Sequence, residues 1–441
     1  MGKKRRRRGI SPGSVLMIWM TVLVVAACAA FLLAIAGEDV VERTASLVRS
    51  LSEQGVFERA GEATPEPSAA PEAQMPSVPE APQSGEEAEE TVAPQAFSFT
   101  LAAAGTVYAP KAVRAAAEDS AGNYDFGEIL SGLGGLLSEA DLALATLETA
   151  AAGEERGYGS YNAPPELLSA LRDSGVNVLS LATERALDKG YDGLELTLRE
   201  MNSRALGCVG IAQEEGASGA QVLRVGGVQV AVLAYSYGLS DEGIEQTDGD
   251  ERGAVVLIDE MRMVRDITAA RLDGANVVIV MPHWGVKNRA ETPQEVRELA
   301  VKLAEAGADV ILGAHPNVVQ GTERLSVTRS DGLTYEAAVC YSLGSLLTDA
   351  RAPENTAGMV ARLKVTYDPA ARRVSLGDLA CAPVYIASQR EDGRSVYRVV
   401  DVENAAAMAL LTQTEREAAI EAAKTVRDVT GQSEREQEGE G

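Results

Sequence analysis

Residues 306–320, AGADVILGAHPNVVQ, decide the fold of this chain. The run DVILGA within them is short and apolar, as fully buried strands are. The residues before it, 293–306, have the apolar periodicity of an amphipathic helix. A helix that leads directly into a short buried strand is the repeating unit of a parallel sheet, so this stretch predicts an α/β fold.

The same alternation continues on both sides of this stretch. Toward the N-terminus, the apolar runs FTLAAAG, LALATLE, VNVLSLA, VQVAVLAYS and NVVIVM alternate with segments of helical periodicity near 127–140, 165–174, 192–202 and 259–272. Toward the C-terminus, VCYSLGS, MVARLKVTYD and RRVSLGDLACAPVYIA predict hairpin-linked strands. We therefore expect one mixed α/β domain over residues 96–401.

Polar residues follow the predicted strands at the point where each strand ends. These clusters are Gly105-Thr106, Thr146-Leu147-Glu148, Thr183-Glu184-Arg185, His283-Trp284-Gly285 and His315-Pro316-Asn317. Ligand sites of α/β proteins lie at the carboxyl ends of the strands, because the loops converge there. Polar residues often occur at strand ends without having a function. Here, however, both histidines of the chain fall at predicted strand ends. The sequence therefore predicts that these five segments meet in one pocket.

Charge and cysteine content narrow the possible partners. The chain of 441 residues has a net charge of −25, and six of its 40 basic residues lie at 3–8, so 34 basic residues face 65 acidic ones in the remainder. Such a body repels nucleic acid, and we expect no nucleic-acid partner.

The four cysteines form no CxxC pair. We therefore interpret them as small buried side chains, and neither a zinc site nor a redox motif is indicated.

The N-terminus has the pattern of a membrane anchor. Residues 15–36 contain no charge over 22 positions, which is long enough to cross a bilayer as a helix. The basic segment 1–14 places the N-terminus in the cytoplasm by the positive-inside rule, so the rest of the chain is expected outside the cell membrane. A cleaved signal peptide and lipid attachment at Cys28 are the alternatives. The apolar run continues eight residues beyond Cys28, which favours the uncleaved anchor.

Two further segments flank the predicted domain. Residues 37–95 begin with a mixed juxtamembrane stretch and continue as a linker rich in Pro, Glu and Ala, which predicts a disordered stalk. Residues 402–441 are expected to form a C-terminal helix and a charged tail. The stalk would hold the domain away from the membrane and carries no candidate chemistry.

Five motifs, in this order, resemble the CapA family of poly-γ-glutamate capsule synthesis domains, whose fold is related to calcineurin-like metallophosphatases. They are YNAPPELLSAL (161–171), LATERALDKGYDGL (181–194), PHWG (282–285), AGADVILGAHPNVVQ (306–320) and YSLGS (341–345). The resemblance implies a layered αββα sandwich of metallophosphatase type. It also implies a pocket formed by Glu148, Asn162, Glu184, Arg185, His283, Trp284, His315 and Asn317.

The chain departs from the family pattern at most positions where the family places metal ligands. Threonine, arginine, asparagine and serine stand where the family has carboxylate, histidine or asparagine, at Thr106, Thr146, Thr183, Arg185, Asn317 and Ser345. Lys287 replaces an acidic residue near the first histidine. The resemblance thus leaves Glu148, His283 and His315 as metal ligands, with Asn317 or Glu184 as a weak fourth, which predicts one weakly bound divalent metal or none. We hypothesise that Arg185 forms an ion pair with Glu148 or Glu184 in place of a metal, whereas Lys287 is either a second pocket charge or a solvated loop residue.

Three functions remain open on the sequence, and no catalytic residue is assigned. The first is a membrane-anchored accessory protein that binds an anionic surface polymer, together with other capsule-export proteins, with weak or no catalysis. The second is an active metal-dependent hydrolase or transferase acting on an anionic polymer or a phosphoester. The third is an inert spacer that partners recognise through the helix near residues 405–426. Bound metal distinguishes the first two functions.

Overall fold

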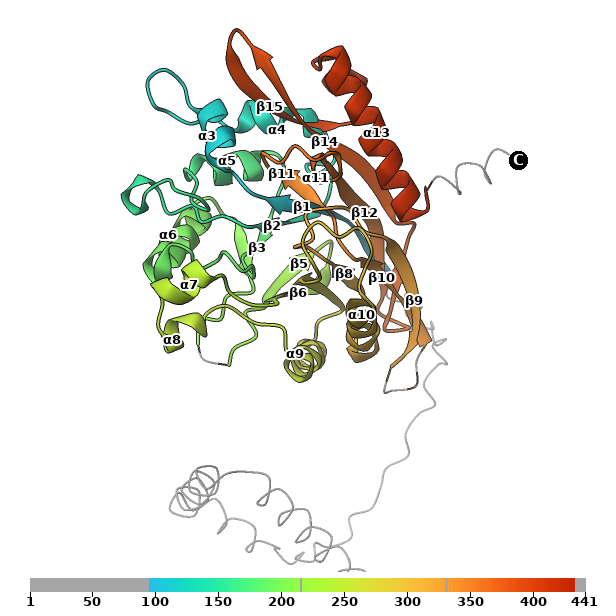
Figure 1. The fold of residues 1–441 in the computed structure, drawn as a ribbon. Helices are drawn as coiled ribbons and strands as arrows, with labels where there is room; N and C mark the ends of the chain where they lie inside the picture. Colours follow the sequence, from blue (N-terminus) through green and yellow to red (C-terminus); the bar gives the residue numbers. More distant parts are fainter. Residues whose placement is uncertain (1–94, 215, 330–331, 333, 433–441) are drawn as a thin grey trace, which may run out of the picture. The chain divides into compact units, whose positions relative to one another are not determined.

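The computed structural model describes residues 95–432 except 215, 330–331 and 333. The segments expected at 1–14, 15–36 and 37–95 lie outside the described residues apart from Gln95. Over the described residues, no helix is both long and apolar enough to cross a membrane. The described part is a mixed α/β fold built on two β-sheets (Figure 1).

The first sheet has nine strands, which run in the order β15-β14-β12-β1-β2-β3-β4, with β11 paired to β1 and β13 paired to β12. The strands β1 to β4 and β11 are parallel, whereas β12 to β15 join them in antiparallel pairs. The strands are β1 (Phe97–Val107), β2 (Leu142–Leu147), β3 (Val178–Ser180), β4 (Gly207–Val209), β11 (Ser345–Leu347), β12 (Ala357–Asp368), β13 (Arg373–Leu376), β14 (Ala380–Glu391) and β15 (Arg394–Asp401).

The second sheet has six strands in the order β5-β6-β7-β8-β10-β9. Its centre, β6 to β8 and β10, is parallel, and antiparallel hairpins close both edges. The turn between β5 and β6 uses Gly226 and Gly227, both at positive φ, as their sequence predicts. The strands are β5 (Gln221–Val225), β6 (Val228–Ser236), β7 (Val277–His283), β8 (Val310–Leu312), β9 (Thr322–Thr328) and β10 (Thr334–Cys340).

The helices of the described residues are α3 (Lys111–Ala117), α4 (Gly127–Leu130), α5 (Glu166–Asp173), α6 (Gly190–Ser203), α7 (Asp241–Gln246), α8 (Gly249–Arg252), α9 (Glu260–Leu272), α10 (Gln294–Ala306), α11 (Pro353–Thr356), α12 (Ala405–Ala409) and α13 (Gln413–Thr430). Helices α3 to α6 cover the outer face of the first sheet, and α9 and α10 cover the outer face of the second. Short 3-10 turns occur at Ser131–Leu133 and Glu154–Arg156. The helix expected over 127–140 is therefore wrong in length, since α4 ends at Leu130 and the 3-10 turn that follows it ends at Gly134, which has positive φ.

Alternation along the strands divides the apolar core into layers. On β1, Leu101 and Ala103 face the core that the two sheets share, whereas Ala102 and Ala104 face a second core beneath α3 to α6. A third core joins the other face of β6 to β8 with α9 and α10, for example through Leu233. Helix, sheet, sheet and helix thus form four layers, which confirms the expected αββα sandwich.

The C-terminal helix belongs to the same compact unit as the sheets. In α13, Ala419, Ala422 and Val426 are buried in the core between the sheets, and Figure 1 shows the helix (red) beside β14 and β12. Thr412 caps its N-terminus by accepting a hydrogen bond from the Glu415 amide. The apolar stripe of α13 is therefore used inside the domain.

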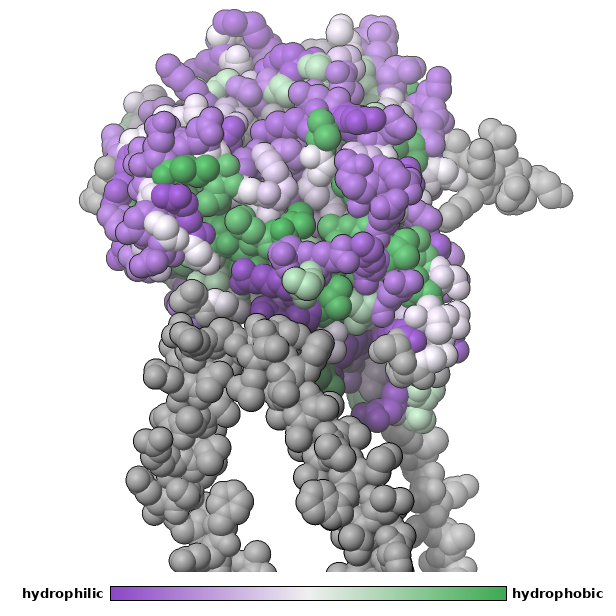
Figure 2. Space-filling model, turned by 60° about the horizontal axis from the view of Figure 1, so that its bottom comes forward, coloured by the Kyte–Doolittle hydropathy of each residue, from purple (hydrophilic) through white to green (hydrophobic). Residues whose placement is uncertain are grey.

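The face of the described residues drawn in Figure 2 mixes hydrophilic and apolar residues. Turning the lower side of Figure 1 forward shows a mostly hydrophilic surface with apolar residues gathered across its middle (Figure 2). Two side chains of α9, Met261 and Leu272, are more than 80% exposed. Isolated apolar side chains of this kind are common on protein surfaces and carry no functional argument here.

Candidate functional site

The polar residues predicted at strand ends lie at or just after the ends of five parallel strands. Thr106 lies near the end of β1, Glu148 directly follows β2, Glu184 lies in the loop after β3, His283 ends β7, and His315 lies in the loop after β8. Since β1 to β3 belong to one sheet and β7 and β8 to the other, the site lies where the carboxyl ends of both sheets meet. Glu148, Thr106, Glu184, His283 and His315 are all buried.

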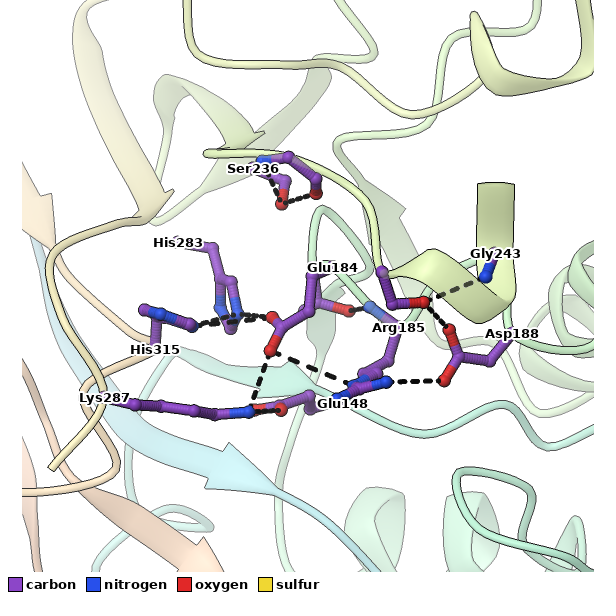
Figure 3. Close-up of polar contacts among 12 residues, drawn as sticks. Glu148, Glu184, Arg185, Asp188, Ser236, Gly243, His283, Lys287 and His315 are labelled. Atoms are coloured by element: carbon purple, nitrogen blue, oxygen red, sulfur yellow. Dashed lines mark hydrogen bonds and ion pairs between the residues drawn. The ribbon is translucent and has the colours of Figure 1, made fainter. Parts of the chain in front are cut away.

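Glu184 and the two histidines form a compact carboxylate–histidine cluster (Figure 3). The Oε2 atom of Glu184 forms a short hydrogen bond with His283 Nε2 and lies 3.5 Å from His315 Nδ1. The two imidazoles are also close, with 3.2 Å between His283 Nε2 and His315 Nδ1. One ligand atom from each of the three residues lies within 4.8 Å of the others. The expected ligand set had Glu148 as the main carboxylate and Glu184 or Asn317 as a weak fourth ligand, but in the structure the carboxylate beside the histidines is that of Glu184.

Lys287 connects this cluster to Glu148. Its ammonium donates a hydrogen bond to Glu184 Oε1 at 2.9 Å and lies 3.5 Å from Glu148 Oε1. Both carboxylate side chains are only 3% exposed, whereas the Lys287 side chain is 36% exposed. Lys287 is therefore a pocket charge that holds two buried carboxylates together, and the alternative of a solvated loop residue is wrong.

Arg185 contacts the pocket carboxylates less closely than expected. Its Nε lies 4.0 Å from Glu184 Oε1, and its closer carboxylate partner is Asp188, at 3.3 Å. The guanidinium also lies over the ring of Tyr161, 4.1 Å from the ring centroid. The proposed ion pair with Glu184 is present but long, so the main cation of the site is Lys287.

Burial and charge shift the pKa values of the site in opposite directions. Burial, with the neighbouring Glu184 second, raises the pKa of Glu148 to about 8. Burial alone would also raise the pKa of Glu184, but hydrogen bonds from His283 and His315 outweigh it and hold that pKa well below its usual value. The pKa of Lys287 is raised, because the two carboxylates outweigh the effect of its burial. Glu184 is thus the permanent anion of the site.

The loop after β8 holds its side chains in place with an unusual backbone. His315 has φ of 97° and Asn317 has φ of 58°, a region that residues other than glycine enter only when the surroundings impose it. The ring of Tyr237 lies against the imidazole of His315, with 4.4 Å between centroids. Tyr237 is half exposed while His283 and His315 are buried, so this ring covers the histidines.

Two of the predicted pocket residues have structural roles. Asn162 donates to the carbonyls of Gly153 and Gly157 and accepts from the Ala152 amide, which fixes the loop after β2. Trp284 is buried, and its indole donates to the carbonyl of Tyr341 at 2.9 Å. Both side chains therefore stabilise the backbone around the site through hydrogen bonds to main-chain groups.

Several site residues were not predicted. A cavity of about 250 Å³ beside Glu148 is lined partly by residues that were not among the predicted pocket residues, namely Tyr108, Tyr161, Asn288, Thr348, Asp349, Ala350 and Asn355. Asn317, which was predicted, also lines it. Tyr161 stood inside a quoted motif, and Asn288 adjoins Lys287, so sequence neighbours gave a signal for these two. The lining residues between 348 and 355 follow β11, and nothing in the sequence indicated that they lie at the site.

The three residues of the carboxylate–histidine cluster fit one divalent cation. One carboxylate and two imidazoles are ligands that zinc accepts, with at least one position left for water or substrate. A bound ion would act as a Lewis acid and would lower the pKa of a bound water. The fit has two weak points, since His283 Nδ1 is buried without a partner that would orient the ring, and the Lys287 ammonium repels a cation. A second ion does not fit, because Lys287 already neutralises the shared carboxylates.

The fold and site together define an α/β sandwich with a carboxylate–histidine centre at the carboxyl ends of its strands. Residues 100–350, more than half of the chain, match the family described as Bacterial capsule synthesis protein PGA_cap. The chain belongs to this family, as the five motifs predicted.

Two curated relatives align with less than half of this chain. The PGA biosynthesis protein CapA of Bacillus subtilis (strain 168) is 29% identical over 189 residues, which are 42% of this chain and 46% of that protein. The Capsule biosynthesis protein CapA of Bacillus anthracis is 26% identical over 192 residues, 43% of this chain and 44% of that protein. The chain thus spans less than half the length of the curated relatives it matches.

Among solved structures, similarity is distant. The calcineurin-like phosphoesterase YfkN from Bacillus subtilis aligns at 12% identity with a TM-score of 0.39, covering 76% of this chain and 98% of that one. A 5'-nucleotidase precursor from Thermus thermophilus aligns at 14% identity with a TM-score of 0.38, covering 75% and 59%. Scores this low carry no argument about the activity of this chain.

Proposed function

We propose that this protein takes part in the synthesis or export of a capsule polymer of the poly-γ-glutamate type, as a membrane-anchored domain outside the cell that binds its substrate and hydrolyses it weakly or not at all. Family membership supports the capsule process. The apolar run at 15–36, preceded by basic residues, supports the anchor and the location. Other capsule-export proteins are the expected partners.

The position of Lys287 is the main observation in support of weak catalysis. Hydrolysis by two metals requires two cations held together by shared carboxylates and imidazoles. Here the ammonium of Lys287 contacts both Glu184 and Glu148, so the protein supplies one of the positive charges itself. An ammonium has no vacant coordination position and cannot activate a water molecule. The remaining cluster of Glu184, His283 and His315 holds at most one ion.

The alternative function is a metal-dependent hydrolase or transferase that acts on an anionic polymer or a phosphoester. The observation that favours it is the same cluster of three buried ligands, since a single ion with an open position is sufficient for some hydrolases. In that case Glu184, His283 and His315 would hold the ion, and activity would be lost on chelation.

Metal content of the purified full chain decides between these functions. We expect elemental analysis to find no more than one divalent ion per chain, lost on dialysis against EDTA. His315→Gln should abolish this binding, whereas Glu242→Gln, which changes an exposed carboxylate on α7, should not. Two ions that resist dialysis, or hydrolysis of the polymer that EDTA stops, would contradict the proposal.

A further inference from the structure

The loop that carries Glu184 is also fixed through its main chain. The carbonyl of Glu184 accepts a hydrogen bond from the Ser240 amide at 2.9 Å. Ser240 is the N-cap of α7, and its hydroxyl accepts a hydrogen bond from the Gly243 amide at 2.9 Å. The start of α7 therefore holds the backbone of the residue whose side chain contacts both histidines.

Asp188 connects this helix start to Arg185 (Figure 3). One of its carboxylate oxygens, Oδ1, accepts a short hydrogen bond from the Ser240 hydroxyl. The other oxygen, Oδ2, lies 3.3 Å from Arg185 Nη1. Arg185 follows Glu184 in the chain and Ser240 binds the Glu184 carbonyl, so Asp188 fixes two residues that adjoin Glu184 at the same time.

The carboxylate of Asp188 does not belong to the carboxylate–histidine cluster, whose ligand atoms come from three other residues. Asp188 is only 3% exposed. A buried carboxylate is costly unless its oxygens are paired. Within the described residues, the hydrogen bonds and the ion pair of this carboxylate go to Ser240 and Arg185. Its buried charge is thus paired entirely within the surroundings of Glu184.

The orientation of His283 depends on Glu184. The Nδ1 atom of His283 is buried without a hydrogen-bond partner among the described residues, so no hydrogen bond fixes the ring from that side. Its Nε2 atom contacts Glu184 Oε2 and His315 Nδ1. Metal-binding histidines are normally oriented by a partner on the second ring nitrogen. Here the Glu184 carboxylate supplies the orientation, so residues that fix Glu184 also fix the imidazoles.

We propose that Asp188 and Ser240 are positioning residues of the carboxylate–histidine cluster. They hold the loop of Glu184 so that its carboxylate and the two imidazoles stay close enough to share one ion. The inference rests on the proposed function in taking the cluster as a site for at most one divalent ion. Both residues act through Glu184 and are not ligands themselves.

Zinc affinity is the first measurement of this positioning. The full chain in detergent is titrated with Zn²⁺ in competition with a coloured chelator. Loss of a residue that orients metal ligands typically weakens metal binding by about 10- to 100-fold. Asp188→Asn and Ser240→Ala should each weaken zinc binding by about this factor. Ser240→Thr keeps a hydroxyl at the N-cap and should retain most of the affinity.

The imidazole signals give a second measurement, which needs no metal. The chain contains only two histidines, and both belong to the cluster, so isotope-labelled histidine reports in NMR on this cluster alone. In EDTA, Asp188→Asn and Ser240→Ala should shift or broaden the signals of both rings, because Glu184 no longer holds them in one arrangement. A merely structural role would lower the free energy of unfolding and leave the imidazole signals of the folded chain unchanged.

Asp241→Asn is the matched control for both measurements. It neutralises an exposed carboxylate on α7, directly after Ser240, and should change neither the zinc affinity nor the imidazole signals. Ser240→Ala removes only a hydroxyl, so it remains informative if Asp188→Asn does not fold. Unchanged imidazole signals in Ser240→Ala, or an equal change in Asp241→Asn, would overturn the inference.

The two measurements also separate this inference from the proposed function. If the unaltered chain binds no zinc while the imidazole signals shift in Ser240→Ala, the positioning role stands without a metal. If two ions bind tightly, the proposed function fails. A weaker zinc affinity in Asp188→Asn and Ser240→Ala would still support the inference in that case.

Discussion

Replacing Lys287 by methionine tests whether one ammonium holds the two buried carboxylates. Its nitrogen lies 2.9 Å from Glu184 Oε1 and 3.5 Å from Glu148 Oε1. Coulomb's law with an effective dielectric constant of ~20 gives upper limits of about 6 and 5 kcal/mol for these contacts. Since the lysine side chain is 36% exposed, solvent screening reduces each value by roughly half.

The protonation state of Glu148 lowers the expected loss further. With its pKa raised to about 8 by burial, Glu148 is mostly neutral near pH 7 and loses little when the ammonium is removed. The contact with Glu184 remains, so we expect Lys287→Met to lower the free energy of unfolding by about 2–3 kcal/mol. Urea unfolding at pH 7 with EDTA measures this change. In the same assay without EDTA, added Zn²⁺ should restore stability to Lys287→Met more than it stabilises the unaltered chain.

Lys302 supplies a matched control for this prediction. Its nitrogen lies 2.8 Å from Glu260 Oε2, almost the same distance, but both side chains are about half exposed. Lys302→Met should leave stability unchanged within error, because exposed pairs contribute little. Equal losses in the two variants would refute the reasoning, since burial of the carboxylates would then have no effect on the strength of the pair.

Three further predictions concern pH and packing. Because burial raises the pKa of Glu148 from 4.5 to about 8, the folded chain holds a proton that the unfolded chain has released between these values. Stability therefore falls as pH rises through this window, by up to about 1.4 kcal/mol per unit, and Glu148→Gln should flatten the curve measured by urea unfolding in EDTA. Asp309 is fully buried and paired with two arginines, so Asp309→Ala should cost about 3–5 kcal/mol in the same assay. At Gly313 a Cβ would lie 2.0 Å from the carbonyl oxygen of Tyr341, so Gly313→Ala should lower the melting temperature clearly, whereas Gly321→Ala, with its nearest contact at 3.6 Å, should not.

The sequence predicted the layers of the fold because the chain is locally consistent. The strands β2, β3 and β7 are each followed by a helix close to the predicted range, namely α5, α6 and α10. The histidines fall at strand ends that the parallel topology must bring together. The helix expected over 127–140 was wrong because its glycines end helical structure early. Local propensity therefore sufficed for most elements and failed over 127–140, where Gly134 takes a positive φ after a short 3-10 turn.

The detailed site was less predictable, because side-chain distances depend on loop conformation. Glu148 and Glu184 both follow strands, and nothing in their spacing shows that Glu184 contacts the histidines while Glu148 reaches them only through Lys287. Asp349 and Asn355 come from a segment far along the chain from Glu148, and only tertiary packing places them in one cavity. The chain has two histidines, so composition alone limits any metal site to two imidazole ligands.

The ring of Tyr237 over the histidines affects how quickly an ion could enter. His283 and His315 are 1% and 5% exposed, so little of either imidazole meets bulk water while Tyr237 stays in place. Exchange of an ion then requires a transient opening of this segment, and its rate follows the frequency of that opening. Removal of a bound ion by EDTA would consequently proceed at the rate of this opening, and dialysis has to last longer than the opening takes.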